Sequence, residues 1–481
     1  MTRKIWFVSP LLLICLSYGA HAAVVNAASC SSSDVQAAVS SAAAGDTVVI
    51  PSGNCTWTFP VTIAGKGIIV QGQTTCSGTP VSSCVDNTNI ADDTSGDNPA
   101  FNITGLDATH FVQLTGVTIT TQAAIADGVI QIYGAGSSNF TNSVSFRVDH
   151  VHLKHPTTSG RGISVFGVYG LIDHFLVDVT DVSGSDQSIS IYGSSIGNDG
   201  GFTPWMNPLS LGTDNAVYVE DSTFNYNNQN EDAVDAYTGG RVVIRYNAFN
   251  NISQGFHGTD SGDNRSVFSY EIYNNIYTNN SSNTIRAATL RGGTGVIYNN
   301  TYGGSHGQWY DVTPMLYRAC PPMDQSQWQT CGGTNWEIGS TDFSSQASRT
   351  GSTNGGVKFC AINRDTVCTT DATCSAITQG DTCSTYFDGA AGGGYSCRDQ
   401  VGRTHNQARS PLYAWNNGSI GITPYNGGYS CGIGLDKYLG PGVDYINGSS
   451  MPGYTAYTYP DPLQNSTSVP NPPTGLTAVV Q

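Results

Sequence analysis

Asp235, His257 and Arg286 are three side chains of different acid–base character at matching positions of short apolar segments. The apolar residues directly before them are Val234, Phe256 and Ile285. Because side chains alternate between the two faces of a β-strand, an inward apolar residue leaves the next residue pointing outward. Strands stacked about 4.8 Å apart would bring the three side chains into one outward column. A carboxylate, an imidazole and a guanidinium in contact could move a proton and neutralise a substrate charge, so we predict that they are catalytic.

Other residues near this column could bind a substrate. Tyr192 and Tyr237 would point outward beside it and offer surfaces on which a sugar ring could stack. Glu231, Asp232 and Arg265 occur in the adjoining loops and raise the local density of titratable groups. We predict that these five residues bind substrate. Under the alternative interpretation, the column consists of ordinary surface charges and a turn histidine.

A second group of chemically active side chains is formed by Asp149 and His150, and by Asp173 and His174, 24 residues later. In stacked coils the two carboxylates would lie about 4.8 Å apart and repel each other unless a cation or hydrogen bonds compensate. Calcium is the hard cation that carboxylates suit, so Asp149 and Asp173 are candidate metal ligands. The alternative is that Asp and His fill turn positions that Asn occupies in later coils.

These residues are embedded in a repeat that predicts how they are positioned. Six seven-residue segments align without gaps, with Val or Ile second and Leu, Val, Phe or Tyr seventh; they start at residues 147, 171, 218, 243, 271 and 296. Their spacing and period-two alternation favour a parallel β-helix over a sandwich or a helical solenoid. Asn274 and Asn299 share one repeat position, and Asn275 and Asn300 share the next, so stacked amides could bond along the axis.

The two ends of the chain differ from this middle part. Asp34 could cap a short helix through Val35, Ala38 and Val39 that would cover the open end of the stack. After residue 304, Gly, Ser and Cys dominate and the strand periodicity fades, and the last residues are rich in proline. We assign residues 23–304 to the β-helix with its cap, 305–455 to loops that pack on or close it, and 456–481 to a flexible tail.

Residues 1–22 have the features of a signal peptide. Arg3 and Lys4 precede a mostly apolar run, and Ala20-His21-Ala22 resembles a cleavage site. Cleavage would remove Cys15 and leave an even number of the 13 cysteines, which fall in two clusters, near the start and late in the chain. No CxxC pair is present, so disulfides are favoured over zinc. No later stretch is apolar enough to span a membrane. We expect a secreted monomer.

Three stretches of sequence resemble a known family. The capping-helix region followed by "AAAGDTVVIPSGNCTW" is similar to the start of right-handed β-helix proteins of the pectin-lyase-like superfamily, and "YSCRDQVGR" and "PLYAWNN" resemble a closing segment of its secreted bacterial members. The resemblance implies a right-handed parallel β-helix over about residues 30–420. It leaves the activity open, because the family includes polysaccharide lyases, glycoside hydrolases, adhesins and tailspikes.

Two short motifs resemble active-site signatures of that family. "FRVDHVHL", which contains Asp149 and His150, resembles the Asp-His signature of pectate lyases, and "GFHG", which contains His257, resembles the Gly-His-Gly of polygalacturonases. The partner motifs of both subfamilies are missing: Arg-x-Pro-x-x-Arg in the first case, Asn-Thr-Asp and Arg-Ile-Lys in the second. Neither subfamily is therefore assigned.

Charge and composition limit the function classes. The formal net charge of −16 argues against nucleic acid and disfavours polyanionic glycans unless a cation bridges like charges. We predict a secreted protein that cleaves or binds an extracellular polysaccharide or cell-surface glycan, as a lyase or as a hydrolase. A hydrolase needs two nearby carboxylates, for which Asp235 with Asp232 or Glu231 are the candidates. The alternative is a non-catalytic adhesion protein whose flat faces bind glycan or partner proteins.

Overall fold

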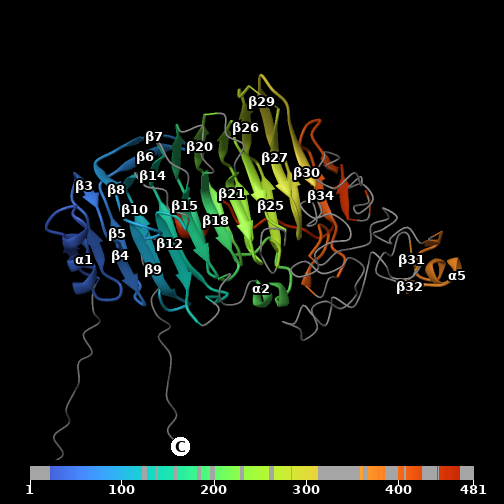
Figure 1. Cartoon of the computed structure of the whole chain (residues 1–481), viewed down its shortest axis with the longest axis horizontal. Coiled ribbons are helices and arrows are strands. Elements are labelled where there is room, and N and C mark those ends of the chain that lie inside the picture. The colour runs from blue at the N-terminus through green and yellow to red at the C-terminus, as the bar shows by residue number, and fades with distance from the viewer. Residues whose placement is uncertain are drawn as a thin grey trace, which may run out of the picture.

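The chain forms an elongated stack of coils, and the predicted all-β parallel β-helix is confirmed (Figure 1). The computed structural model describes residues 22–121, 127–136, 139–155, 160–180, 186–195, 201–227, 232–258, 265–282, 284–312, 358–360, 367–380, 382–384, 399–405, 408–424, 441–442 and 444–465. The predicted signal peptide lies outside these residues, apart from Ala22. None of the helices among them is long and apolar enough to cross a membrane.

Three parallel sheets run the length of the stack, and each regular coil adds one strand to each sheet. Within the described residues, sheet A contains, in spatial order, β1 (Val24–Asn26), β2 (Thr47–Val49), β5 (Ile69–Gln71), β10 (Val112–Thr115), β13 (Val144–Asp149), β16 (Tyr169–Asp173), β19 (Val217–Glu220), β22 (Arg241–Arg245), β25 (Ser269–Tyr273), β28 (Thr294–Tyr298), β34 (Leu412–Trp415) and β36 (Tyr445–Asn447).

Sheets B and C have the same parallel order. Sheet B contains β3 (Gly53–Trp57), β8 (Thr88–Asp92), β11 (Thr118–Thr121), β14 (His152–His155), β17 (Leu176–Val179), β20 (Thr223–Tyr226), β23 (Ala248–Asn250), β26 (Ile276–Asn279) and β29 (Thr301–Gly304). Sheet C contains β4 (Val61–Ala64), β9 (Phe101–Leu106), β12 (Ile130–Gly134), β15 (Gly160–Phe166), β18 (Asp186–Tyr192), β21 (Asp232–Tyr237), β24 (Ser253–Phe256), β27 (Ile285–Leu290), β30 (Gln308–Val312) and β35 (Ile422–Pro424).

Each repeat segment found in the sequence spans the turn between sheets A and B. One residue of this turn has a left-handed backbone, with φ between 48° and 58°: His150, His174, Asp221, Tyr246, Asn274 or Asn299. Asn, Asp and His bear this conformation better than most residues, which explains their recurrence. The two Asn274-type residues therefore make the turn rather than an amide ladder.

The amide ladder runs through the next repeat position, as expected for Asn275 and Asn300. The Nδ2 of Asn247 donates to Asn275, that of Asn275 to Asn300 and that of Asn300 to Asn417, over 3.0–3.1 Å. All four side chains are buried. The ladder therefore satisfies polar groups that burial would otherwise leave unpaired.

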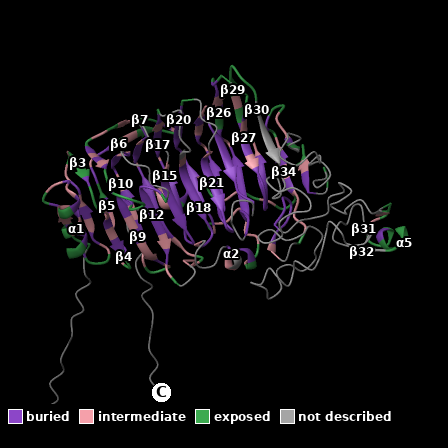
Figure 2. Cartoon of the chain, viewed as in Figure 1, coloured by how far each residue is buried: buried purple, intermediate pink, exposed green. Residues whose placement is uncertain are grey.

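The interior of the stack is filled by the inward residues of the three sheets, mostly Val, Ile, Leu and Phe (Figure 2). On the inner face of sheet B, Phe224, Phe249, Tyr277 and Tyr302 stack with ring centroids 4.9–5.2 Å apart. One coil cannot bury this surface alone, so neighbouring coils stabilise each other.

The N-terminal end is closed by α1 (Ser32–Ser41), which confirms the predicted helix. Val35, Ala38 and Val39 are buried in the core cluster. The capping residue is Ser31, whose hydroxyl accepts from the Asp34 backbone, and not Asp34 as expected. Asp34 lies in the first turn, where its charge still suits the helix dipole.

The late part of the chain continues the stack, so the expected β-helix boundary at residue 304 was wrong. β30, β34, β35 and β36 pair in parallel with the preceding coils. The described residues after β30 also include a small antiparallel unit of β31 (Lys358–Cys360), β32 (Val367–Cys368) and β33 (Cys383–Ser384) beside α5 (Asp371–Ser375). The loss of apolar periodicity in the long insertion hid the strands beyond it.

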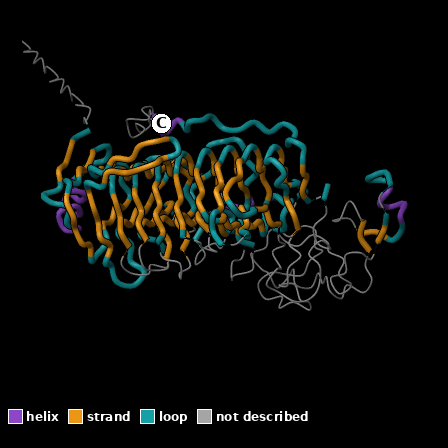
Figure 3. The backbone as a smooth tube through the Cα atoms, turned by 90° about the horizontal axis from the view of Figure 1, so that it is seen from above, coloured by secondary structure: helices purple, strands orange, loops and turns teal. Residues whose placement is uncertain are grey.

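Residues 451–465, here called the C-terminal strap, return along the outer face of sheet A (Figure 3). Arg245 donates to the carbonyls of Tyr457 and Thr458 over 2.9 Å, and the Tyr459 ring stacks on Tyr246 at 3.6 Å. The strap ends in the 3-10 helix η4 (Pro462–Asn465). The assignment of 456–465 to a flexible tail was therefore wrong; 466–481 lie outside the described residues.

Disulfides join cysteines as the composition predicted. Cys30 bonds to Cys55 and Cys76 bonds to Cys84, the second pair across the hairpin of β6 (Thr75–Gly78) and β7 (Val81–Val85). Cys374 and Cys383 are also disulfide-bonded. A short helix, α2 (Phe202–Met206), packs against the turns that lead from sheet C to sheet A; its Trp205 is fully buried and donates to the Ser266 carbonyl at 2.7 Å.

Candidate active site

The outer face of sheet C carries a connected cluster of polar side chains centred on Asp235 of β21. The Asp235 carboxylate is fully buried and lies 3.0–3.1 Å from Nδ1 of His257. It accepts from the Tyr237 hydroxyl at 2.6 Å and from Nε2 of Gln187 at 3.0 Å. Arg161 extends this hydrogen-bond network by donating to Gln187 at 2.9 Å. A buried carboxylate thus fixes the orientation of an imidazole whose side chain is 11% exposed.

Asp232, on the same strand, forms a carboxyl pair with Asp235 over Gly255 of β24. A β-carbon placed on Gly255 would lie 2.6 Å from the carboxyl carbon of Asp232 and 2.9 Å from that of Asp235. The two carboxyl carbons are therefore at most about 5.5 Å apart. Any side chain at this position would collide with both acids, so glycine leaves room for the pair.

The environment raises the pKa values of both acids toward neutral pH. Desolvation raises the pKa of Asp232 to about 7, with a further rise from the Asp235 charge and opposition from Ser253, Arg291 and Arg286. Desolvation raises the pKa of Asp235 to about 6, opposed by Arg291 and the Tyr237 hydrogen bond. Two interacting acids with perturbed pKa values are typical of catalytic centres, where groups must gain and lose protons near pH 7.

The predicted single column of Asp235, His257 and Arg286 was wrong in its register. Asp235 pairs with Gly255, so His257 lies two positions further along, level with Tyr237, on which its ring stacks at 4.0 Å. Gly255 pairs with Thr289, which leaves Arg286 three residues away. Asp235 and His257 still meet because the aspartate reaches diagonally across the sheet.

Arg291 lies where the sequence suggested Arg286. It follows Leu290 as His257 follows Phe256, and its amide donates to the Phe256 carbonyl at 3.1 Å. The positive charge of Arg286 instead acts on Asp232, whose carboxylate it helps to stabilise. The signal for Arg291 was present in the sequence, because it follows the apolar Leu290. The sequence aligned Ile285 and not Leu290 with Phe256, however, which placed the arginine five residues too early.

Arg161 and Gln187 also belong to the site but were not predicted from the sequence. They pair with each other across β15 and β18, two residues before the apolar Ile163 and Ile189 of these strands. Gln187 connects Arg161 to the Asp235 cluster, because it also donates to the Tyr237 hydroxyl at 2.6 Å. The three arginines around the acids are Arg161, Arg286 and Arg291.

Tyr192 and Tyr237 belong to a ladder of rings along sheet C rather than to an open platform. Tyr133, Phe166, Tyr192, Tyr237 and His257 stack in order, with centroids 4.5, 4.7, 4.7 and 4.0 Å apart. Both faces of the two central tyrosines are covered by neighbouring rings, so a sugar could not stack on them. Their position in the column is as expected.

The other predicted substrate-binding residues lie apart or outside the description. Arg265 is fully buried and donates to both carboxylate oxygens of Asp399 at 2.7 Å, with its guanidinium over Trp205. It joins the late part of the chain to the stack instead of facing the acid pair. Glu231 lies outside the described residues.

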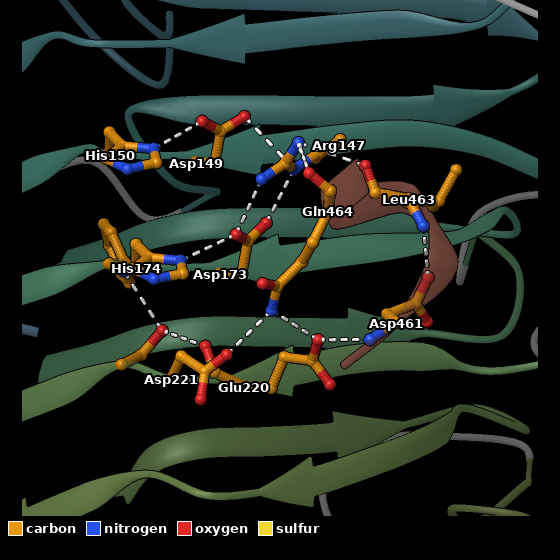
Figure 4. A network of polar contacts seen from close by, with 12 residues as sticks. Arg147, Asp149, His150, Asp173, His174, Glu220, Asp221, Asp461, Leu463 and Gln464 are labelled. Atoms are coloured by element: carbon orange, nitrogen blue, oxygen red, sulfur yellow. Dashed lines mark hydrogen bonds and ion pairs between the residues drawn. The ribbon is translucent and has the colours of Figure 1, made fainter. Parts of the chain in front are cut away.

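The second group predicted from the sequence lies on the outer face of sheet A, under the C-terminal strap (Figure 4). Arg147 contacts Asp149 at 3.3 Å and donates to both oxygens of Asp173 at 2.8 Å. His150 and His174 each contact the adjacent aspartate, and their rings stack at 4.9 Å.

Arg147 supplies the positive charge that the sequence analysis assigned to calcium between Asp149 and Asp173. Although burial alone would raise the pKa of Asp149, the contacts with His150 and Arg147 hold it below its ordinary value. Among the described residues, no group of three or more His, Cys, Asp or Glu side chains is arranged to hold a metal ion. The predicted calcium pair therefore has no ligand set in that part of the chain.

Comparison with known proteins gives similarity to solved structures only. No family model matches the chain, and no curated protein does. ORF18 of Geobacillus virus E2 is similar over 59% of this chain and 58% of its own length, with 12% identity and a TM-score of 0.30. The crystal structure of an alginate lyase from Paenibacillus sp. str. FPU-7 is similar over 60% of this chain and 98% of its own, with 14% identity and a TM-score of 0.31. The site's own geometry therefore has to support any function.

Proposed function

We propose that the protein is a secreted polysaccharide-cleaving enzyme of the lyase type, acting at the outer face of sheet C. The observation that carries the proposal is the contact between the buried carboxylate of Asp235 and Nδ1 of His257, beside arginines. An imidazole oriented through Nδ1 presents Nε2 as a general base. The disulfides and the apolar N-terminal run support secretion.

In this mechanism His257 removes the proton from the carbon next to a uronate carboxyl group. The electrons form a carbon–carbon double bond as the bond to the glycosidic oxygen breaks, and that oxygen takes a proton from Asp232. The raised pKa of Asp232, about 7, supports this acid role because a large fraction of the carboxyl groups is protonated at neutral pH. Arginine at the site would neutralise the uronate, which favours removal of the neighbouring proton.

The arginines near the acid pair also explain how a protein with a negative net charge could bind an anionic polysaccharide. The chain as a whole is acidic, with a formal charge of −16, but the charges of Arg286 and Arg291 act on a pair of acids that are partly protonated near pH 7. The local field at the site therefore favours an anionic substrate even though the global field does not.

A retaining glycoside hydrolase is the second candidate, favoured by the separation of the carboxyl pair. An upper limit of about 5.5 Å matches a retaining enzyme and excludes the wider spacing of inverting enzymes. The contacts of Asp235 weigh against it, because a nucleophile needs a reachable oxygen. Asp235 is buried and its oxygens are engaged by Gln187, Tyr237 and His257.

The test is product analysis on a panel of uronate polysaccharides, including alginate, polygalacturonate and hyaluronan, with β-glucan and galactomannan as neutral members. A lyase gives unsaturated products that absorb in the ultraviolet, and His257→Ala should abolish them. Reducing ends without that absorbance would establish the hydrolase. No product from any substrate would reject both and leave the adhesion hypothesis.

A further inference from the structure

The aromatic ladder of sheet C ends at Tyr133, and its last ring borders a groove. The groove has a volume of about 510 Å³ and is lined by Asn102, Thr104, Gln131, Tyr133, Asn139 and four small residues. One face of the Tyr133 ring stacks on Phe166 at 4.5 Å. The other faces β9, where the outward residues are Asn102 and Thr104 and no ring continues the ladder.

Tyr133 is held in a fixed orientation. Its hydroxyl donates to Oε1 of Gln131 at 2.9 Å, and Nε2 of Gln131 donates to the carbonyls of Asp97 and Gly128 at 3.3 Å. Gln131 is buried, whereas Tyr133 keeps part of its surface exposed. A ring fixed in this way loses little conformational entropy when a ligand stacks on it.

The groove offers amides, hydroxyls and an aromatic face but no charged side chain among its lining residues. The nearby charges of Asp127 and Arg161 pair with each other at 3.3 Å. An aromatic face next to amides matches the apolar ring face and the hydroxyl groups of a pyranose, and the lining has no cation to pair with a carboxylate.

We infer that this groove is a distal subsite that binds the uncharged ring face of a sugar residue in a polysaccharide held along sheet C. The inference rests on the proposed function for its ligand class and deepens it. Tyr133 and His257 lie at the two ends of the ladder, four strand spacings apart, or about 19 Å. Only an oligosaccharide of several units could reach both, so the enzyme would prefer long chains and cut within them.

The test compares Tyr133→Ala with the chain that is unchanged at residue 133, here called wild type, and with Ile276→Ala, a control that shortens an exposed side chain on sheet B. In the binding experiment all three proteins, including this reference, carry His257→Ala, so that binding is measured without cleavage. Retardation in native gels containing each of the five polysaccharides should show about tenfold weaker binding for Tyr133→Ala, the loss expected for one aromatic contact. Tyr133→Phe should retain most of the affinity.

With His257 intact, Tyr133→Ala should raise KM for polymers and leave KM for the shortest cleaved oligosaccharide unchanged. Weaker binding by Tyr133→Ala would support the subsite even if no polysaccharide is cleaved, which separates this inference from the proposed chemistry. Equal retardation of Tyr133→Ala and wild type by every polysaccharide that binds, or no retardation of wild type by any, would overturn it.

Discussion

The outer faces of sheets A and C carry the same kinds of side chain, and they differ in how the charges are compensated. On sheet A, Arg147 engages Asp149 and Asp173 directly, and the C-terminal strap supplies carbonyls to its remaining donors. On sheet C, Asp232 and Asp235 share a cramped site and have raised pKa values. Aspartate, histidine and arginine at one site therefore do not define a function. A raised pKa alone is not the sign either, because desolvation raises the pKa of Glu220 on sheet A to about 7. What sheet C adds is two such acids side by side, one of them in contact with an imidazole.

The strap makes this contrast larger. Glu220 accepts from the Asp461 amide at 2.9 Å and from Nε2 of Gln464 at 2.6 Å, and it pairs with the fully buried Arg245. The carbonyls and amides of the strap bond to the polar side chains on the outer face of sheet A and cover them, so these side chains are buried. The face of sheet A is thus structural, and the proposed chemistry belongs to sheet C.

The most informative test replaces one aspartate on each face with asparagine. Asp235→Asn should lower the rate of cleavage about 10²–10⁴-fold, because His257 loses the charge that orients it. The acidic limb of its pH–rate profile should also shift, which a purely structural role would not cause. Asp149→Asn should leave the rate of the folded protein unchanged and lower stability by about 1–3 kcal/mol, through the lost charge on Arg147 and His150. Kinetics and thermal unfolding of both variants check this, and the reverse pattern would break the comparison.

Removing the central cation of sheet A should destabilise the protein strongly. Arg245→Met leaves Glu220 buried without its partner, which costs about 3–5 kcal/mol. The strap should become sensitive to proteases at the same time, because Arg245 holds its carbonyls. Arg161→Met, on sheet C, is the matched control and should change Tm much less. Similar losses in the two variants would contradict the structural role of sheet A.

Neutralising Asp232 on sheet C should stabilise the protein, in contrast to the loss of Arg245 on sheet A. The pKa of Asp232 is higher in the folded chain than in the unfolded one, so the folded state binds its proton more tightly. Its stabilising contribution is complete below the unfolded value of about 3.8 and is lost as pH rises through about 7. Asp232→Asn should therefore raise stability by about 1–3 kcal/mol at pH 8 and by little at pH 4. Urea unfolding at both pH values measures this, and destabilisation at pH 8 would count against a strained acid pair.

Chelation should have the smallest effect. Since Arg147 compensates Asp149 and Asp173, EDTA should leave Tm unchanged within error. A fall in Tm that calcium restores would show that a cation, and not the arginine, holds these carboxylates.

The sequence was sufficient for the fold because the repeat is local. Val or Ile at the second position of each segment marks an inward residue, and the recurring Asn275-type position marks the ladder. The helix α1 was also predictable from its apolar spacing. The strands beyond residue 304 were not, because a long insertion separates β30 from the next strand of the stack.

The site was predictable only in part, since its assembly depends on register. Asp235 and His257 were found because each follows an inward residue, but Phe256 pairs with Leu290 and not with Ile285, so Arg291 takes the place expected for Arg286. Gln187 contacts the centre through its length rather than its strand position. The sequence did carry a signal that Tyr192 and Tyr237 are covered by neighbouring rings, because Phe166, Tyr192 and Tyr237 occupy the same position of successive strands. No pattern in the sequence tells that residues 451–465 lie on sheet A.

The most direct measurement is the titration of individual aspartates by NMR of carboxyl carbons, with assignments from Asp232→Asn, Asp235→Asn and Asp149→Asn. The account predicts two coupled steps near pH 6 and 7 from the pair on sheet C, and a pKa for Asp149 below its ordinary value. Ordinary acidic titration of Asp232 and Asp235, with both fully ionised at pH 5, would contradict the claim that the acid pair of sheet C exchanges protons near neutral pH.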